Sequence, residues 1–155
     1  MKKLRYIATT LFCLVVVVAM AFAEPKATQD STFFSGDDLH YVGYIMLTGD
    51  TSAWQNIQDD DLYYFSKSIY FRNVKTLSFI NHDDVYFLGQ ALITGNKKEL
   101  DKIITDDLYY LGMALFEKTV SYLDNVRSDD IFYLGKGLIL KDMNFLDQLS
   151  SKTQK

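Results

Sequence analysis

The sequence predicts an all-α protein, a short α-solenoid made of five 23-residue helix-turn-helix repeats. Asp-Asp pairs recur along the chain at a constant interval of 23 residues. Each pair is followed by apolar residues at the spacing of one helical face, and then by a second capped apolar segment. The pairs define the units 37–59, 60–82, 83–105, 106–128 and 129–151.

The first half of each unit has the pattern of an amphipathic helix of about 11 residues. Counted from the first aspartate of the pair, positions 3, 6, 7 and 10 hold apolar or small residues, which is the i, i+3, i+4, i+7 spacing of a helix. A glycine inside a helix costs about 1 kcal/mol relative to alanine, so a glycine repeated at one position indicates a packing requirement. Position 7 holds Gly43, Ser66, Gly89, Gly112 and Gly135.

The aspartate pairs allow two interpretations. An aspartate at a helix start caps free backbone N–H groups and faces the positive end of the helix dipole. Calcium binding between repeats is the alternative, but an ion needs six to eight oxygens, and helix starts about 10 Å apart share one poorly. We therefore expect the first aspartate of each pair to be a helix N-cap, and no metal site. The predicted caps are Asp37, Asp60, Asp83, Asp106 and Asp129.

A second, shorter helix of about two turns is predicted in the other half of each unit. Position 14 is a good capping type in every unit, and apolar residues follow at positions 18 and 21. Gly49 and Gly95 suit the end of the preceding helix. The predicted caps at position 14 are Asp50, Asn73, Asn96, Thr119 and Asp142, and position 18 holds Trp54, Leu77, Leu100, Leu123 and Leu146.

This plan resembles tetratricopeptide-type or Sel1-type helical repeats in its general architecture. The 23-residue period of this chain is shorter than the roughly 34 residues of a tetratricopeptide repeat, and the signature residues of that family are missing. The resemblance implies that each helix pair buries its apolar face against neighbouring pairs.

The N-terminus has the layout of a secretory signal peptide over residues 1–23. A basic start is followed by an apolar run and by Ala21-Phe22-Ala23, a small-x-small cleavage site. The alternative is an uncleaved membrane anchor, but the apolar core is shorter than the roughly 20 residues that span a bilayer. Residues 24–36 are then a lead-in, in which Phe34 covers the first unit, and residues 152–155 a tail. The sequence thus predicts export to the periplasm or the extracellular space.

The charge and cysteine content of the exported chain exclude several functions. Loss of a segment that carries Lys2, Lys3 and Arg5 and no acidic residue changes the formal net charge from −4 to −7. Nucleic acids and anionic membranes bind basic surfaces, so neither is an expected partner. Cys13 is the one cysteine and leaves with the signal, so the exported chain has no disulfide.

Aromatic residues recur beside the aspartate pairs and form the candidate binding surface. One interpretation is packing between repeats, and the other is a surface for a peptide or a sugar, because amphipathic rings suit interfaces. The tentative binding residues are Tyr41, Tyr64, Phe87, Tyr110 and Tyr133 at position 5, with Tyr63, Tyr86 and Tyr109 at position 4.

Positions 8 and 12 are expected to be the most exposed positions of the first helix. They differ between units, and such variation is where a repeat protein encodes individual recognition. Position 8 holds Tyr44, Lys67, Gln90, Met113 and Lys136, and position 12 holds Thr48, Phe71, Thr94, Glu117 and Leu140.

The sequence contains no GxSxG, HExxH or P-loop motif. We therefore expect a non-enzymatic protein without a cofactor, an exported binding or scaffold module for a protein or peptide. One alternative is a glycan or small-ligand binder that uses the aromatic residues. Another is a structural subunit that self-assembles through the uncovered faces of its terminal repeats, which would make it a homo-oligomer. A hydrolase that uses paired carboxylates ranks last.

Overall fold

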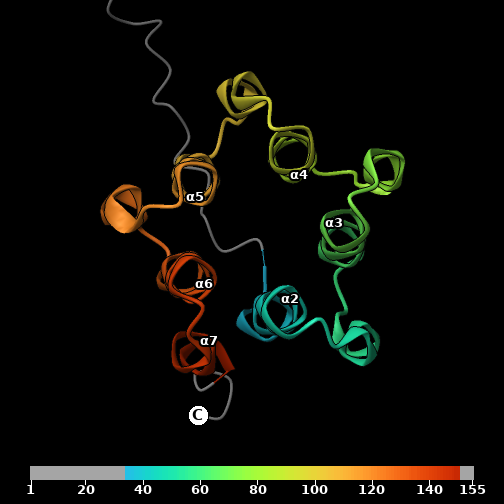
Figure 1. The fold of residues 1–155 in the computed structure, drawn as a ribbon, viewed down its shortest axis with the longest axis vertical. Helices are drawn as coiled ribbons and strands as arrows, with labels where there is room; N and C mark the ends of the chain where they lie inside the picture. Colours follow the sequence, from blue (N-terminus) through green and yellow to red (C-terminus); the bar gives the residue numbers. More distant parts are fainter. Residues whose placement is uncertain (1–33, 151–155) are drawn as a thin grey trace, which may run out of the picture.

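A computed structural model describes residues 34–150, and this part of the chain is helical, without strands (Figure 1). The predicted all-α helical-repeat class is confirmed. The signal peptide, most of the lead-in and the tail lie outside the described residues. Five longer helices alternate with short ones, and these longer helices are α2 (Gly36–Thr48), α3 (Asp60–Phe71), α4 (Asp83–Thr94), α5 (Asp106–Glu117) and α6 (Asp129–Leu140). The short helices are η1 (Thr51–Asn56), η2 (Val74–Phe79), η3 (Lys97–Lys102), η4 (Val120–Asn125) and α7 (Met143–Ser150).

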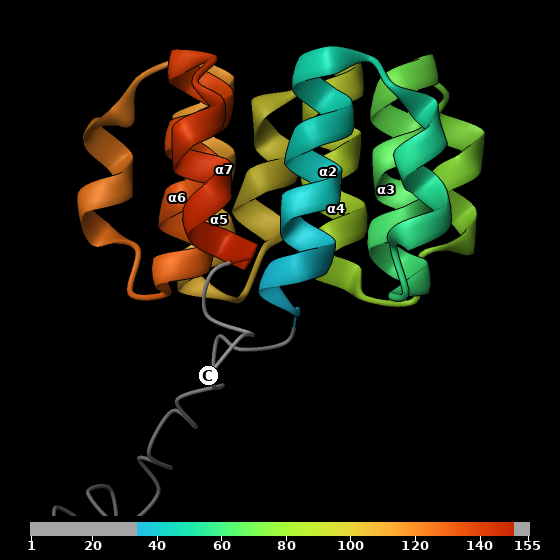
Figure 2. The same ribbon diagram turned by 90° about the horizontal axis from the view of Figure 1, so that it is seen from below.

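The repeats form a closed ring. Each long helix packs against the next, and α2 also packs against α6 and α7, so the first unit contacts the last. Figure 1 looks down the ring, with α2 to α6 around the centre and the η helices outside them. In Figure 2 the helices run along the ring axis. Helix α7 packs against both α6 and α2 in the way that η2 packs against both α3 and α4, so the junction of the two ends resembles the internal junctions.

The short helices begin at the predicted caps. Asp50, Asn73, Asn96 and Thr119 are the N-cap residues of η1 to η4, and the side chain of each accepts a hydrogen bond from the backbone N–H two residues on. Asp142 does the same for Asn144, at 3.0 Å. Four of the short helices are 3₁₀-helices of six residues, which gives the expected two turns at about three residues per turn. The hydrogen bonds from Ser52 lower the pKa of Asp50, so the stability from this cap is present above the unfolded-state pKa and is lost as the pH falls through the lowered value.

The long helices end in a residue with left-handed backbone conformation. Gly49 and Gly95 adopt it with φ of 75° and 70°, as their place in the sequence predicts. The equivalent residues of the other units are Arg72, Lys118 and Lys141, with φ of 50°, 54° and 55°. The fold therefore imposes this conformation in every unit, including three that lack glycine.

A buried leucine at position 18 explains the small residue at position 7. Leu77, Leu100, Leu123 and Leu146 have exposed fractions of 0%. An added Cβ on the position 7 glycine of the following unit would lie only 2.7 or 2.8 Å from Cδ2 of that leucine. Gly43 of the first unit meets Leu146 of the last in this way, at 2.7 Å. The same contact thus joins neighbouring units and closes the ring.

The first and second units replace this contact by a hydrogen-bonded pair. Trp54 stands where the other units have leucine, and Ser66 where they have glycine. The Trp54 indole Nε1–H donates to Ser66 Oγ at 3.0 Å, and Ser66 Oγ donates to the carbonyl oxygen of Tyr63 at 2.9 Å. The hydrogen bond between Trp54 and Ser66 therefore takes the place of the leucine–glycine contact at this junction.

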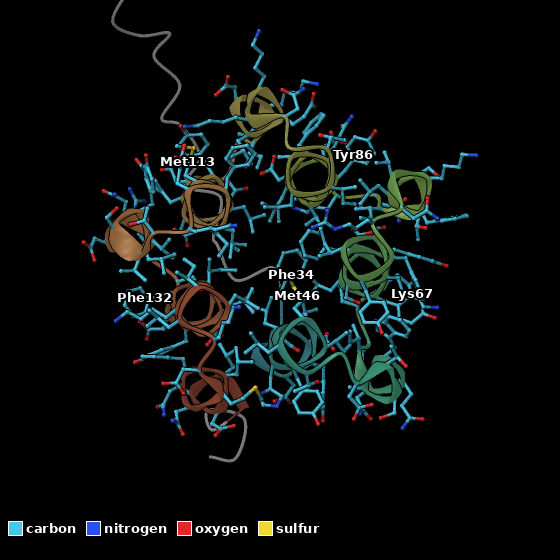
Figure 3. The ribbon with its side chains drawn as sticks, viewed as in Figure 1. Phe34, Met46, Lys67, Tyr86, Met113 and Phe132 are labelled. Atoms are coloured by element: carbon cyan, nitrogen blue, oxygen red, sulfur yellow. The ribbon has the colours of Figure 1, made fainter. Side chains whose placement is uncertain are left out.

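Apolar side chains fill the centre of the ring. Residues at positions 3, 6 and 10 of the long helices point inward and leave a cavity of about 20 Å³, which has room for about one water molecule. Phe34 lines this cavity, and its ring centroid is 6.0 Å from that of His82, which precedes α4. Phe34 therefore covers the centre of the ring at the end where the long helices begin (Figure 3), and not only the first unit that its place in the lead-in predicts.

We expect Leu146→Ala to destabilise the protein by about 2–5 kcal/mol, the usual cost of emptying a fully buried leucine site. Leu100→Ala is the matched variant at an internal junction, and the closed ring predicts a similar cost for both. The free energy of unfolding from urea titration is the measurement. In an open stack the last junction would be frayed, so a Leu146→Ala cost far below that of Leu100→Ala would contradict closure. Leu140→Ala, at an exposed site, serves as a control and should change stability by no more than about 0.5 kcal/mol.

Candidate functional site

The two aspartates of a pair have different roles, and in the first four pairs the second one is structural. Its carboxylate accepts hydrogen bonds from backbone N–H groups at the far end of the same unit, 20 or 21 residues later. Asp107, which is 2% exposed, accepts from Arg127 N at 2.8 Å and Ser128 N at 2.9 Å. Asp38, Asp61 and Asp84 make the same kind of contact. The second aspartate therefore fixes the connection that leads into the next unit.

The first aspartate is not the N-cap, which corrects the prediction for Asp37, Asp60, Asp83, Asp106 and Asp129. The cap is the residue before the pair in α3 to α6, and Ser35 in α2. Asp59 Oδ1 accepts from Leu62 N at 2.8 Å, and Ser128 Oγ from Ile131 N at 3.4 Å. The first aspartate instead lies in the first turn, where the helix dipole still favours a negative charge. The sequence pattern could not show which of several adjacent polar residues keeps the extended conformation of a cap.

Residues 34–150 contain no group of three or more His, Cys, Asp or Glu side chains that could hold a metal ion. Of the two histidines, His40 has its Nδ1 at 3.0 Å from the carbonyl oxygen of Leu146 in α7. That contact belongs to the junction between α2 and α7, so His40 is part of the ring closure.

The aromatic residues at positions 4 and 5 are half-buried between the long and short helices. Seven of the eight tentative binding residues pack against the core, and Tyr110 is half-buried without such a contact to the core cluster; the seven are Tyr41, Tyr63, Tyr64, Tyr86, Phe87, Tyr109 and Tyr133. Their ring pairs are edge-to-face contacts between chain neighbours, with centroids 5.3–5.5 Å apart. Figure 3 shows Tyr86 and Phe132 on the side of their helices that faces away from the ring centre.

The two positions turn toward different short helices. Tyr64 at position 5 stacks on Phe79 of its own unit, with centroids 5.0 Å apart. Tyr63 at position 4 faces the preceding unit, because Lys67 Nζ lies 4.2 Å from its ring centroid and 5.3 Å from that of Trp54. The rings therefore pack the short helices onto the long ones and do not form one continuous aromatic surface.

Positions 8 and 12 differ from each other in exposure. Every residue at position 12 is exposed, as predicted. Position 8 is half-buried in four units, and Met113 is only 7% exposed, so the prediction for this position is wrong. The short helices flank the outer side of the long helices and cover position 8, which a helical wheel of one isolated helix does not show.

An exposed aromatic cluster is one surface feature that packing does not explain. It consists of Trp54 from η1 and of Tyr70 and Phe71 from the end of α3. The ring centroids are 5.5 Å apart for Trp54 and Tyr70, 5.7 Å for Trp54 and Phe71, and 5.0 Å for Tyr70 and Phe71. Phe71 is 63% exposed and Tyr70 43%. The variability of position 12 pointed to Phe71, but no pattern in the chain indicated that Trp54 lies beside it.

A second apolar surface is the open mouth of the ring, at the end where the long helices finish. The position 10 side chains surround it together with residues from the helix ends. This mouth has a volume of about 520 Å³, within the range of ligand-binding clefts. Its lining residues are Met46, Leu47, Thr48, Ile69, Leu92, Leu115, Leu138, Lys141 and Met143.

Comparisons with protein-family models, with curated proteins and with solved structures found no match. Within residues 34–150, no helix has the length and apolarity needed to cross a lipid bilayer. The candidate sites therefore rest on the geometry of the ring.

We expect Asp107→Ala to lower the free energy of unfolding by about 2–4 kcal/mol, because two backbone N–H groups lose their acceptor at about 1–3 kcal/mol each. Asp106→Ala is the matched control. It removes an exposed carboxylate in the first turn and should cost no more than about 1 kcal/mol. Equal costs in a urea titration would show that the two aspartates do not differ in role.

Proposed function

We propose that the chain is an exported binding module that docks a protein or peptide through the aromatic cluster of Trp54, Tyr70 and Phe71. The observation that carries the proposal is the exposure of Tyr70 and Phe71 beside Trp54. Exposed rings cost free energy in water, and Trp and Tyr are enriched among the residues that dominate protein-protein binding.

The cluster is held on a rigid support, which favours binding. The Trp54 indole Nε1–H is already bonded to Ser66, so the ring is fixed before a partner arrives. Tyr70 lies against Gly49, whose added Cβ would be 3.9 Å from Tyr70 Cε2. A pre-ordered aromatic surface loses less conformational entropy on binding than a flexible one.

The cluster is specific to one sector of the ring. The other units have Thr48, Thr94, Glu117 and Leu140 at the position of Phe71. A function shared by all five units would be expected at a position that repeats, whereas recognition of one partner needs a surface that occurs once.

The alternatives have weaker geometric support. A sugar-binding aromatic surface depended on the position 5 rings, which are half-buried and separated by the short helices. Self-assembly through uncovered terminal repeats depended on free end faces, and in the ring these faces cover each other. The acidic charge of the chain also continues to disfavour nucleic acid as the partner.

The test is a comparison of Phe71→Ala with Phe79→Ala. Phe79 belongs to the same unit, is 60% exposed against 63% for Phe71, and lies at the other end of the ring, so it is a matched control. A partner captured from the native envelope by the wild-type protein is purified, and its affinity for each variant is measured by calorimetry. We expect Phe71→Ala to weaken binding at least about tenfold, a loss of about 1.4 kcal/mol or more, and Phe79→Ala to leave it within about twofold. Equal affinities for both variants would remove the cluster from the proposed function.

A further inference from the structure

The two faces of the ring carry opposite charges. The face where the long helices begin has exposed carboxylates in the first turns of α3 to α6, namely Asp60, Asp83, Asp106 and Asp129. The short helices finish on the same face and add the exposed Asp101, Asp124 and Asp147. Two cations near this face are paired, Lys102 with Glu99 at 2.7 Å and Arg127 with Asp106 at 3.9 Å. We refer to this surface as the acidic face.

Among the described residues, the opposite face carries six exposed cations against two exposed acids, Asp50 and Glu117. Arg72, Lys118 and Lys141 occupy the left-handed positions at the ends of α3, α5 and α6. No ion pair of these three residues occurs within residues 34–150. Lys75, Lys97 and Lys98, at the starts of the short helices, are also exposed there, and Lys97 pairs with Glu117 at 2.6 Å. This is the cationic face, and it surrounds the apolar mouth.

The repeat places the two sets of charges at matching positions. The carboxylates and the cations lie at the two ends of the same long helices, and therefore at a similar distance from the ring axis (Figure 2). Because the units are arranged around that axis, two rings placed one on top of the other bring cations opposite carboxylates at each rotation by one unit.

The apolar mouth adds a reason for contact beyond charge. Helix dipoles alone favour acidic residues at helix starts and basic residues at helix ends, but they do not account for an open apolar mouth of about 520 Å³ in the cationic face. Met46, Ile69 and Leu92 line the mouth and are half-buried. A ring stacked on this face would remove them from water, which stabilises the contact by about 25 cal/mol per Å² of apolar surface.

We propose that the occupant of the cationic face is the acidic face of a second copy of this chain, so that the rings stack head to tail on a common axis. A head-to-tail contact leaves one face free at each end, so the assembly grows into short columns rather than stopping at a dimer. This inference does not depend on the partner proposed for the aromatic cluster.

The test is sedimentation velocity of the purified exported protein alone, over a range of concentrations. In about 0.01 M salt, where charges act over about 30 Å, we expect the mean mass to rise with concentration above that of one chain. In about 1 M salt, where they act over about 3 Å, the mass should return toward that of one chain. A protein that stays monomeric in both, or an association that salt does not weaken, would overturn the proposal.

Charge reversal separates this contact from unspecific association. The double variant Lys118→Glu with Lys141→Glu should weaken association at least about tenfold. The matched control, Lys67→Glu with Lys136→Glu, changes the charge equally but on the outer wall, where Figure 3 shows Lys67 and where Lys136 Nζ lies 4.6 Å from the ring centroid of Phe132. It should weaken association less than about threefold. Thermal unfolding checks that both variants fold. Equal effects of the two double variants would overturn the proposal.

Charge exchange provides the final arm. Asp60→Lys with Asp83→Lys makes the acidic face more basic, so this variant alone should not stack. Mixed with the Lys118→Glu, Lys141→Glu variant, it should form columns that contain both chains, because each interface then has opposite charges. A mixture of the two folded variants that stays monomeric under conditions where the wild type associates would overturn the proposal.

Discussion

The fold depends on one contact, the insertion of a buried leucine between two long helices. Leu146 contacts both long helices at its junction. A Cβ added to Gly137 of its own unit would lie 2.8 Å from Leu146 Cδ2, and a Cβ added to Gly43 of the first unit would lie 2.7 Å from it. The leucine side chain thus keeps the short helix between two long ones, and the missing side chains set how closely they approach. Four junctions repeat this contact and the fifth replaces it by the Trp54–Ser66 pair, and the successive turns bring α2 against α6 and α7.

Closure changes how the repeats share stability. In an open array, stability is a sum of unit and junction contributions, and the end units lack one neighbour. In this ring each long helix has a neighbour on both sides, and the bond between His40 and the Leu146 carbonyl spans 106 residues of sequence. Loss of any one junction opens the whole ring, so unfolding should be cooperative. The surfaces left for binding are then the two faces and the outer wall, and the end surfaces of the array are no longer among them.

The sequence predicts the features that depend on the spacing of residues within one unit. It does not predict the features that depend on the angles between all five units taken together. The caps of the short helices at Asp50 and Asn73, and the glycine requirement at position 7, follow from residue type and periodicity. Closure depends on the angle added at every junction, which no single unit encodes visibly. The exposure of position 8 was misjudged for a related reason: Met113 faces outward from its helix, but the neighbouring short helices bury it. The predicted N-cap of α3 was wrong by one residue, because Asp59 and Asp60 have the same side chain and only their backbone conformations differ.

The departures from the repeat carry the most information about function. Trp54 and Ser66 each break a rule that the other units follow, yet they form one hydrogen-bonded pair, so neither can change alone without loss. That substitution replaces a compact leucine by a large ring, which is only half-buried and meets Tyr70 and Phe71 at the surface. A structural change confined to the core would not need exposed aromatic neighbours. The coincidence of an altered junction with an exposed aromatic surface supports the proposal that the first two units serve recognition, while the other three units maintain the ring that holds this surface in place.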